Sequence, residues 1–304
     1  MAAIEVEDLR KRYGGTVAVD GVSFAVERGE IFGVLGRNGA GKTTTVECLV
    51  GLRKADSGRT RVLGLDPHAD RDRLRQVVGV QLQQAELHDG LRVLELVRMY
   101  RSFYPTGADP EELVTRLGLW ESRRTPFAHL SGGQAQRLSI ALALVGAPRV
   151  AVLDELTTGL DSPARRDMWG LVEGMRDDGV TVVLVTHIME EAERLCDRIA
   201  VMHAGKVVAL DTPAGLVDRA DAAPAVSFRV HGSFEPTMLT ALASVHDVDV
   251  RGEVVHATGH ADLVHDGALV REITDALEHH GVVMSDLRTH RPSLDDAFLA
   301  MTED

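Results

Sequence analysis

Cysteine is scarce in this chain of 304 residues, which has only Cys48 and Cys196, and neither has metal-ligating neighbours. We therefore expect two reduced, partly buried thiols and no disulfide framework. The sequence also lacks any apolar run of about 18 residues, the length that a membrane-spanning helix needs. Its charged N-terminal segment has no apolar core of the kind found in signal peptides. We expect a cytoplasmic protein whose role at a membrane, if any, comes through a partner.

Positive charge is in deficit as well. The chain has 33 Lys and Arg residues against 46 Asp and Glu, a formal net charge of −13 at pH 7. Nucleic-acid-binding proteins usually have an excess of Lys and Arg, so this composition disfavours that class. An acidic chain can still carry a local basic patch. With 44% hydrophobic and 26% charged residues, the chain has the composition of a globular protein. Its length suits one large domain, or a large domain with a small one.

Short apolar runs rich in Val and Ile recur along the chain, separated by stretches of helical pattern. Near-continuous apolar strands that alternate with helices are typical of a mostly parallel sheet covered on both faces. Arg198–Gly205 and Lys206–Leu210 are expected to form a strand pair joined at Ala204-Gly205. The expected strands are Ile31–Gly36, Arg149–Asp154, Val180–Thr186, Arg198–Gly205 and Lys206–Leu210.

Two changes of pattern divide the rest of the chain. Between Leu87 and Gly146 the pattern turns helical, and Asp109 followed by Pro110 predicts a helix start there. The segment Asp218–Ala225 is short, polar and alanine-rich, like a linker. We therefore expect one domain over residues 1–217 and a small accessory domain over 218–304.

The small domain has the order strand, helix, strand, strand, helix, strand, which predicts a split βαβ, ferredoxin-like arrangement. A last helix is expected after PSLDDAF, capped by Ser293. The expected elements are Val226–Val230, Pro236–Val245, Asp247–Arg251, Glu253–Thr258, Ala268–His280 and Val282–Thr289.

The segment GRNGAGKT, from Gly36 to Thr43, fits the phosphate-loop pattern G-x-x-x-x-G-K-[ST]. It follows an expected strand and precedes an apolar helix, which is the context that the motif requires. Glycines let the backbone wrap a phosphate, and the helix presents its positive N-terminus to the same anion. Lys42 is expected to reach the β- and γ-phosphates, and the Thr43 hydroxyl to hold Mg²⁺. This segment predicts a nucleotide-binding site.

Asp154 and Glu155 end an expected strand, at the edge of an open α/β sheet where ligands bind. Because side chains alternate along a strand, the two acids need different roles. Asp154 suits the water shell of Mg²⁺, and Glu155 suits the water that attacks the γ-phosphate, as general base or positioning acceptor. The alternative is an acidic strand end that faces only solvent.

Two further residues suit the same site by position alone. His187 follows the expected strand that ends at Thr186, which makes it a candidate contact of the γ-phosphate, although the chain has 13 histidines. Tyr13, within LRKRYGG, is a candidate for stacking on adenine. Ordinary packing explains a lone aromatic residue equally well.

Together these segments resemble the nucleotide-binding subunits of ATP-binding-cassette (ABC) transporters, over roughly residues 3–217. The motifs stand in the order of that family. RYGG is similar to the A-loop, GRNGAGKTT to Walker A, Gln83 in GVQLQQAEL to the Q-loop glutamine, LSGGQ to the family signature, VLDE to Walker B, GLD to the D-loop and THIMEEAERLCDRIAVM to the H-switch and its helix.

The resemblance implies an α/β fold: a P-loop NTPase (RecA-like) core with an antiparallel β subdomain and a helical subdomain, plus a small C-terminal α+β domain. It implies ATP and Mg²⁺ as cofactors, and catalytic roles for Lys42, Glu155 and His187. Implied metal contacts are Thr43, Gln83 and Asp154. Implied nucleotide contacts are Tyr13, Gly36, Asn38, Gly39, Ala40, Gly41, Lys42, Thr43, Thr44, Gln83, Ser131, Gly132, Gly133, Gln134 and Asp161.

The signature begins a second helix that can bind phosphate, capped by Ser131 and left bare by two glycines. The resemblance implies that this helix faces the Walker A motif of a second subunit, so that two ATP molecules lie between a head-to-tail pair. The chain has one phosphate loop and one signature. It therefore needs a second nucleotide-binding subunit, the same or different, and we expect a homodimer.

Three positions depart from the family pattern or leave it open. Leu156 stands where the family usually has proline after the Walker B glutamate, which would leave the turn that places Glu155 less rigid. Arg37 replaces a common proline in Walker A, at a position that the motif leaves free. Gln84 is an alternative to Gln83 for the Q-loop; the spacing to Leu87 favours Gln83.

The segment GKVVALDTPAGL and the tail RPSLDDAFLAMTED resemble the ATPases of type-2 exporters of the daunorubicin/doxorubicin-resistance kind. The resemblance implies an ATPase at the cytoplasmic face of the membrane that drives export of a hydrophobic, drug-like molecule through a separate permease. The coupling helix of that permease would meet the Q-loop and about residues 84–104. A lipid or glycan exporter is the alternative.

Two rival classes are also open. A soluble ABC ATPase that acts on ribosomes or DNA usually carries two cassettes or a long coiled-coil insertion, and neither is visible in this sequence. A regulatory module with inactive ATPase chemistry is disfavoured by the intact Lys42, Glu155 and His187.

Overall fold

Two compact units make up the chain in the computed structural model, Met1–Pro213 and Ala214–Asp304. The structure describes residues 2–81, 87–219, 224–232, 234–260, 267–290 and 293–302. The two units divide at the start of helix α8 (Pro213–Arg219), slightly before the boundary at 217 that the composition suggests. Most of this helix therefore belongs to the second unit.

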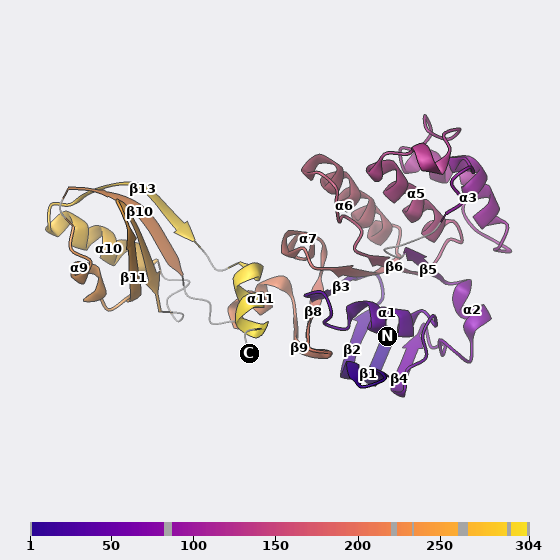
Figure 1. The fold of residues 1–304 in the computed structure, drawn as a ribbon, viewed down its shortest axis with the longest axis horizontal. Helices are drawn as coiled ribbons and strands as arrows, with labels where there is room; N and C mark the ends of the chain where they lie inside the picture. Colours follow the sequence, from indigo (N-terminus) through magenta and orange to yellow (C-terminus); the bar gives the residue numbers. More distant parts are fainter. Residues whose placement is uncertain are drawn as a thin grey trace. The chain divides into compact units, whose positions relative to one another are not determined.

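A six-stranded sheet in the order β5-β6-β7-β3-β8-β9 forms the centre of the first unit (Figure 1). Its first five strands are parallel, and β9 pairs antiparallel with β8, which confirms the expected strand pair. Strands β3, β6 and β7 are buried at every position, as expected for a sheet covered on both faces. The strands are β3 (Ile31–Gly36), β5 (Val78–Gln81), β6 (Val150–Asp154), β7 (Thr181–Thr186), β8 (Arg198–His203) and β9 (Lys206–Asp211).

The register of this sheet brings the motifs to one edge. Leu35 of β3 lies beside Thr186 of β7, and Asp154 of β6 lies beside Val185. Because the three strands are parallel, the segments that follow them all leave the sheet at its carboxyl edge.

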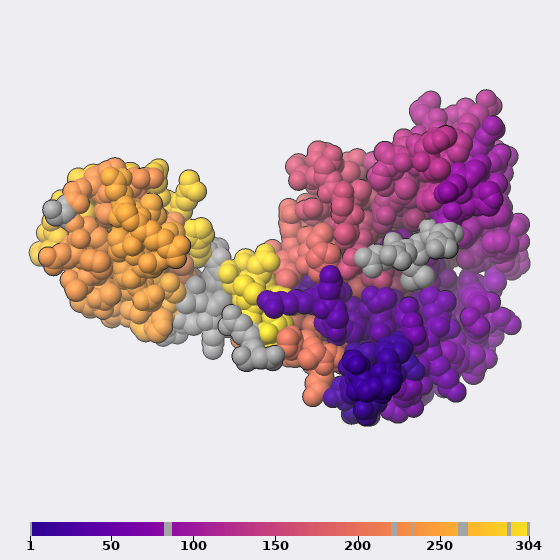
Figure 2. All heavy atoms as spheres, viewed as in Figure 1, coloured from indigo at the N-terminus to yellow at the C-terminus, as the bar shows by residue number. Residues whose placement is uncertain are grey.

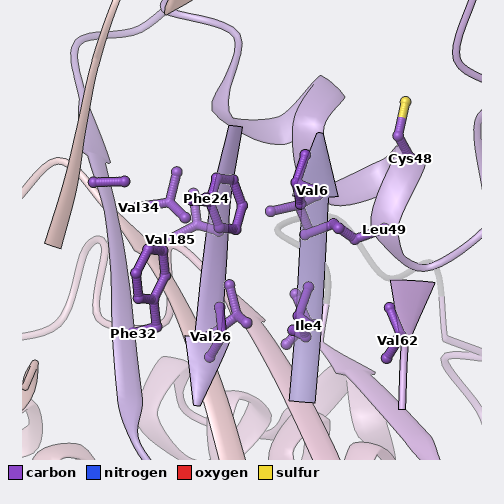
Figure 3. Close-up of a cluster of buried hydrophobic side chains, with 14 of the residues drawn as sticks. Ile4, Val6, Phe24, Val26, Phe32, Val34, Cys48, Leu49, Val62 and Val185 are labelled. Carbon is purple, nitrogen blue, oxygen red and sulfur yellow. The ribbon is translucent and has the colours of Figure 1, made fainter. Parts of the chain in front are cut away.

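A three-stranded antiparallel sheet in the order β2-β1-β4 belongs to the same unit, with β1 (Ala2–Tyr13), β2 (Thr16–Glu27) and β4 (Ser57–Val62). Its apolar side chains share one core with β3 and with helix α1 (Lys42–Leu49), as Figure 3 shows. Phe24 of β2 stacks on Phe32 of β3 with ring centroids 5.1 Å apart. Cys48 lies in this core, and burial raises the pKa of its thiol to about 11. Cys48 and Cys196 are both free and buried, as expected.

A helical part of the first unit, drawn in magenta, lies away from the indigo N-terminal residues in Figure 2. Helices α3, α4 and α5 contact one another there. The Asp109 carboxylate accepts hydrogen bonds from the amides of Glu111 and Glu112, which confirms the predicted start of α4. The helices of this part are α3 (Val93–Arg101), α4 (Pro110–Arg116) and α5 (Gly132–Leu144), with a 3-10 turn at Phe127–His129. Three other helices contact strands of the central sheet: α2 (Arg71–Arg75), α6 (Ser162–Asp177) and α7 (Met189–Leu195).

The second unit contains an antiparallel sheet in the order β11-β12-β10-β13. This order, with one helix in each crossover, is the ferredoxin-like arrangement that the sequence predicts. Apolar residues of the sheet, such as Phe228, pack with Leu269, Ile273 and Leu277 of α10. The elements are β10 (Ala225–His231), α9 (Thr237–Thr240), β11 (Val245–Arg251), β12 (Val254–Gly259), α10 (Ala268–His279), β13 (Val283–His290) and α11 (Leu294–Thr302).

Helix α9 is shorter than the expected helix over Pro236–Val245. After Thr240 the chain makes single turns, in which Leu242 and Val245 donate to carbonyl groups three residues back. The Ser244 amide instead donates to the Glu272 carboxylate of α10, at 3.1 Å. The tertiary contact ends the helix where local pattern favours its continuation.

The last helix starts as predicted, because the Ser293 hydroxyl accepts a hydrogen bond from the Asp296 amide at 3.3 Å. Within the part of the chain that the structure describes, no helix combines the length and apolar character needed to cross a bilayer.

Candidate active site

The phosphate loop connects β3 to α1, and close backbone contacts explain two of its glycines. A Cβ atom at Gly36 would lie 2.6 Å from the carbonyl oxygen of Met202. Gly41 has a φ of 97°, in the left-handed region, and a Cβ atom there would lie 2.3 Å from the carbonyl oxygen of Ala18. Only glycine fits these two positions without displacing β2 or β8. The neighbouring strands therefore fix the course of the loop.

Lys42 is folded into this loop. Its Nζ donates to the carbonyl oxygens of Gly36, at 2.7 Å, and Arg37, at 3.2 Å, and its side chain is buried. Burial lowers the pKa of Lys42, while the nearby carboxylates of Glu155 and Asp154 act in the opposite direction. A buried ammonium held by neutral carbonyl groups attracts anionic oxygens strongly.

A pocket of about 430 Å³ opens beside the loop. Every residue that lines this pocket, except Ala18, was predicted from the sequence to belong to the site. The predicted residues come from three separate segments of the chain. Gly36 and Ala40 belong to the same loop but do not line the pocket. The lining residues are Tyr13, Ala18, Asn38, Gly39, Gly41, Lys42, Thr43, Thr44 and Glu155.

Asp154 is fully buried at the end of β6, next to this pocket. Burial raises the pKa of Asp154 to about 6, and the neighbouring Glu155 carboxylate raises it further, whereas Lys42 and a hydrogen bond from Thr43 oppose the shift. Among the described residues, its Oδ1 atom has no hydrogen-bond partner. Mg²⁺ favours carboxylate and hydroxyl oxygens, so an unpartnered carboxylate oxygen beside Thr43 fits that ion. The structure thus supports Thr43 and Asp154 as the residues that could hold Mg²⁺.

Glu155 follows Asp154 with a φ of 51°, a left-handed conformation that is uncommon for a residue with a side chain. Its amide donates to the Val185 carbonyl at 2.9 Å, which ties it to β7. Its Oε1 atom lies 3.2 Å from Nδ1 of His187, while the glutamate side chain is 10% exposed and the histidine 39%. Glu155 therefore lines the pocket with its carboxylate beside His187.

Comparisons with known proteins agree with this geometry. The profile of the ABC transporter family matches residues 19–158. The Nod factor export ATP-binding protein I of Ralstonia nicotianae is 38% identical, over 98% of this chain and 93% of that protein. The chain belongs to the ABC transporter family. It is the ATP-binding subunit, an ATPase coupled to transport.

Other members resemble the chain over nearly its full length. The daunorubicin resistance ATP-binding protein DrrA2 of Streptomyces coeruleorubidus is 34% identical, over 99% of this chain and 95% of that protein. The linearmycin resistance ATP-binding protein LnrL of Bacillus subtilis is 31% identical, over 98% of both chains.

Solved structures of ABC cassettes match the first unit in fold. One ATP-binding subunit of an ABC transporter superposes with a TM-score of 0.65 at 27% identity, over 71% of this chain and 92% of that chain. A dimeric structure of the bacterial ABC transporter cassette MJ0796 gives a TM-score of 0.62 at 28% identity, over 69% and 98%. The expected P-loop NTPase fold with its antiparallel and helical parts is confirmed.

Tyr13, in the A-loop position, is half exposed at the end of β1 and has cations beside its ring. The Arg53 guanidinium lies 5.0 Å from the ring centroid, and the Lys11 ammonium lies 5.7 Å from it. Glu47 of α1 holds Arg53 through a contact of 2.5 Å between Oε2 and Nε. Sequence reasoning missed Arg53 and Glu47, because nothing local indicates that they meet Tyr13.

The signature helix α5 starts with a reciprocal cap. The Ser131 hydroxyl accepts from the Gln134 amide at 3.3 Å, and the Gln134 side chain accepts from the Ser131 amide at 3.0 Å. Gly132 would admit a Cβ atom without any contact within 4 Å, and one at Gly133 would meet only Ala164 of α6. None of these residues lines the pocket beside the phosphate loop. The helix start is thus open, and it is not part of that pocket.

Asp161 caps the neighbouring helix α6, where its carboxylate accepts from the Ala164 amide at 2.9 Å. It does not line the pocket either. The Q-loop prediction, Gln83 with Gln84 as the alternative, lies outside the described residues. Gln81, which sequence reasoning missed, is buried at the end of β5, and its side-chain oxygen accepts from the Asp154 amide at 3.1 Å.

A buried acid connects the elements behind the site, and sequence reasoning missed it too. Glu191 of α7 is fully buried and accepts hydrogen bonds from the Thr157 hydroxyl at 2.9 Å and from the Trp169 indole at 3.4 Å. Leu156 is also fully buried. The turn after Glu155, which lacks the usual proline, is therefore held by side-chain burial and by hydrogen bonds. The sequence feature that could have indicated this contact is the acid Glu191, which precedes the buried Ala192 in the H-switch helix.

Proposed function

We propose that the pocket beside the phosphate loop binds ATP with Mg²⁺ and hydrolyses it. Lys42 and the loop amides would bind the β- and γ-phosphates, and Tyr13 would stack on adenine. Thr43 and Asp154 would hold Mg²⁺, which supplies charge neutralisation at the phosphates when bound. The observation that carries this proposal is the convergence of Tyr13, Lys42 and Glu155 on one pocket.

Glu155 is the proposed acceptor for the proton of the attacking water. Its carboxylate lies within the pocket lining and is oriented by the contact with His187. That contact uses Nδ1 of the imidazole, so the Nε2 edge is left to contact the γ-phosphate. His187 would therefore orient Glu155 and sense the presence of the terminal phosphate.

The pocket needs a second copy of the chain to be complete. Ser131, Gly132, Gly133 and Asp161 do not line it, yet the start of α5 is open and capped as a phosphate-binding helix end. In a head-to-tail homodimer, this helix start would close the ATP site of the partner. A relative solved as a dimeric cassette supports this assignment.

A second pocket, of about 630 Å³, suits the separate membrane subunit. Val50 and Leu52, which follow α1, line this pocket together with Tyr100 and Phe103 of the helical part. Leu52 and Phe103 are 53% and 63% exposed, which is unusual for such large apolar side chains. We propose that a helix of the permease docks here, which would keep the chain at the cytoplasmic face of the membrane.

The transported molecule is proposed from relatives. Those named for daunorubicin and linearmycin resistance support export of a hydrophobic small molecule, and those named for Nod factor export keep a lipid or glycan cargo as the second candidate. Because cargo contacts belong to the permease, the two candidates share the same ATPase chemistry.

The test is Glu155→Gln, which preserves shape but removes the proton acceptor. ATP turnover should fall by a factor of about a hundred or more, while ATP binding persists and a stable dimer accumulates. Light scattering with and without ATP measures the dimer. Glu190→Gln, an exposed acid at the start of α7, is the matched control. Turnover of Glu155→Gln within a few-fold of the wild type would refute the role of Glu155.

A further inference from the structure

The second unit has a pocket of about 360 Å³ on its sheet. Residues Val226, Phe228 and Val230 of β10 pack in the core with α9 and α10. Because side chains alternate along a strand, Ser227 and Arg229 point to the opposite face, which these helices leave uncovered. The pocket lies on this face and is lined mainly by Ser227, Arg229, His256, Asp286, Arg288 and His290.

Strand register explains how three strands supply this set. Ser227 of β10 pairs with His256 of β12 on one side and with Arg288 of β13 on the other. A register shift follows in β13, where Asp286 has a φ of 55°. Asp286 and Arg288 are two residues apart along β13, so both side chains lie on the same face of the sheet and line the pocket.

The charge of this pocket contrasts with the unit around it. Residues 214–304 include sixteen acidic and six basic residues, so this unit carries most of the net charge of −13. The pocket nevertheless gathers two of those six arginines and a single acid, together with His256 and His290. Basic side chains thus concentrate at one place in a strongly acidic unit.

One of the two arginines has its charge available. Arg229 pairs with Glu253 at 3.1 Å and with Asp286 at 3.7 Å. The side chain of Arg288 has no ion pair or hydrogen bond with any residue that the structure describes. An unpaired guanidinium offers several N–H donors in a fixed plane, the arrangement that recognises oxyanions.

A buried hydroxyl group completes the donor set. Ser227 is only 8% exposed, and its Oγ lies 3.3 Å from Nε2 of His290. Ser227, His256 and Arg288 thus present polar groups from three adjacent strands. A carboxylate is planar and is satisfied by one arginine, whereas a tetrahedral phosphate uses donors from several directions.

We propose that this pocket binds the phosphate group of a small soluble molecule, with Arg288 as its main ion-pair partner. The pocket volume is within the range of small-ligand sites. The site is separate from the ATP pocket, since the two belong to different units. It gives the accessory domain a ligand of its own.

The test uses the full chain saturated with Mg²⁺ and ADP, so that the phosphate loop is occupied. Inorganic phosphate is then titrated while the imidazole resonances of His256 and His290 are followed by NMR with labelled histidine. Single His→Gln variants assign the two resonances. Both should shift and saturate together. Arg288→Gln should weaken phosphate binding about tenfold or more.

The matched control is Arg271→Gln, which removes an exposed arginine of α10 and should leave phosphate affinity unchanged. A parallel titration uses phosphatidylcholine vesicles with and without phosphatidic acid. A response to the acidic vesicles but not to inorganic phosphate would mean that a lipid headgroup is the ligand, and would overturn the proposal. No saturable shift with phosphate, or equal weakening in Arg271→Gln, would also overturn it.

Discussion

A single residue, Asp154, shows how the site and the stability of the fold oppose each other. Its carboxyl group is fully buried beside Glu155, with an oxygen that no described residue satisfies. The cost of burying this charge appears as the rise of its pKa from 3.8 to about 6. A ligand that uses the unpartnered oxygen would recover part of that cost.

We predict that Asp154→Asn stabilises the nucleotide-free protein while removing the response to Mg²⁺. Above pH 6 the variant should gain about 1–3 kcal/mol in free energy of unfolding, because it avoids an ionised buried carboxylate. Unfolding in EDTA, followed by tryptophan fluorescence, measures it. Both tryptophans, Trp120 and Trp169, lie in the first unit, so the signal reports that unit alone.

The pH dependence fixes the sign of this prediction. The folded wild type takes up a proton on Asp154 near pH 6, whereas the unfolded chain does so only near 3.8. The wild type therefore gains stability from this group as the pH falls through that interval, and the advantage of the variant should shrink there. Asp177→Asn, an exposed acid, is the control. An advantage of Asp154→Asn that is independent of pH would contradict the argument.

Arg53 is a second residue whose substitution should change ATP binding without changing the chemical step. Its guanidinium lies over the Tyr13 ring, and Glu47 holds it there. Arg53→Gln should raise KM for ATP about two- to fivefold through a less ordered ring, with kcat unchanged. Steady-state ATPase kinetics measure both constants, and Lys54→Gln, an exposed neighbour, is the control. A fall in kcat at constant KM would mean that Arg53 acts on the chemical step instead.

At the scale of secondary-structure elements, Glu191 joins the H-switch helix α7 to α6 and to the turn after Glu155. Burial raises the pKa of Glu191, and its hydrogen bonds partly oppose this. Because burial disfavours the charged form, we infer that this position requires a hydrogen-bond acceptor rather than a charge.

We expect different results for two substitutions of Glu191. Glu191→Gln keeps an acceptor oxygen and should change stability by less than about 1 kcal/mol, whereas Glu191→Ala leaves two buried donors unsatisfied and should cost about 2–4 kcal/mol. Denaturant unfolding of the first unit distinguishes the two. If Gln costs as much as Ala, the negative charge itself is needed, and the account of this cluster is wrong.

Elements with local signals were predictable from the sequence, and those that depend on distant contacts were not. The phosphate loop, the caps at Asp109, Ser131 and Ser293, and the strand pair at Ala204 each follow from a few consecutive residues. The true length of α9 depends on Glu272, far along the chain. The Glu191 cluster and the Arg53 contact likewise join side chains that only the fold brings together. Tyr13, Glu155 and residues of the phosphate loop do meet at one pocket, whereas Ser131 and Asp161 do not line it. The contacts that support the pocket residues were not foreseeable.

At the scale of the whole molecule, the two units differ in chemistry. The first holds the phosphate loop, the signature and both tryptophans, and the second is strongly acidic, with eight of the 13 histidines. Among its described residues, the first unit has a pocket beside the phosphate loop and an open start of α5 that does not line this pocket. Because the start of α5 does not line the pocket beside the phosphate loop, we propose that two copies of the chain share each ATP site.

The most direct test mixes two inactive variants of the chain. Lys42→Ala disables the phosphate loop and Ser131→Arg blocks the signature, so each homodimer should lack ATP turnover. In a mixed dimer, the intact loop of one chain faces the intact signature of the other. Equal mixing should then restore about a quarter of the wild-type sites, measured as ATP hydrolysis with the cognate permease. Activity that stays at the level of the separate variants, although mixed dimers form, would show that each site is built within one chain.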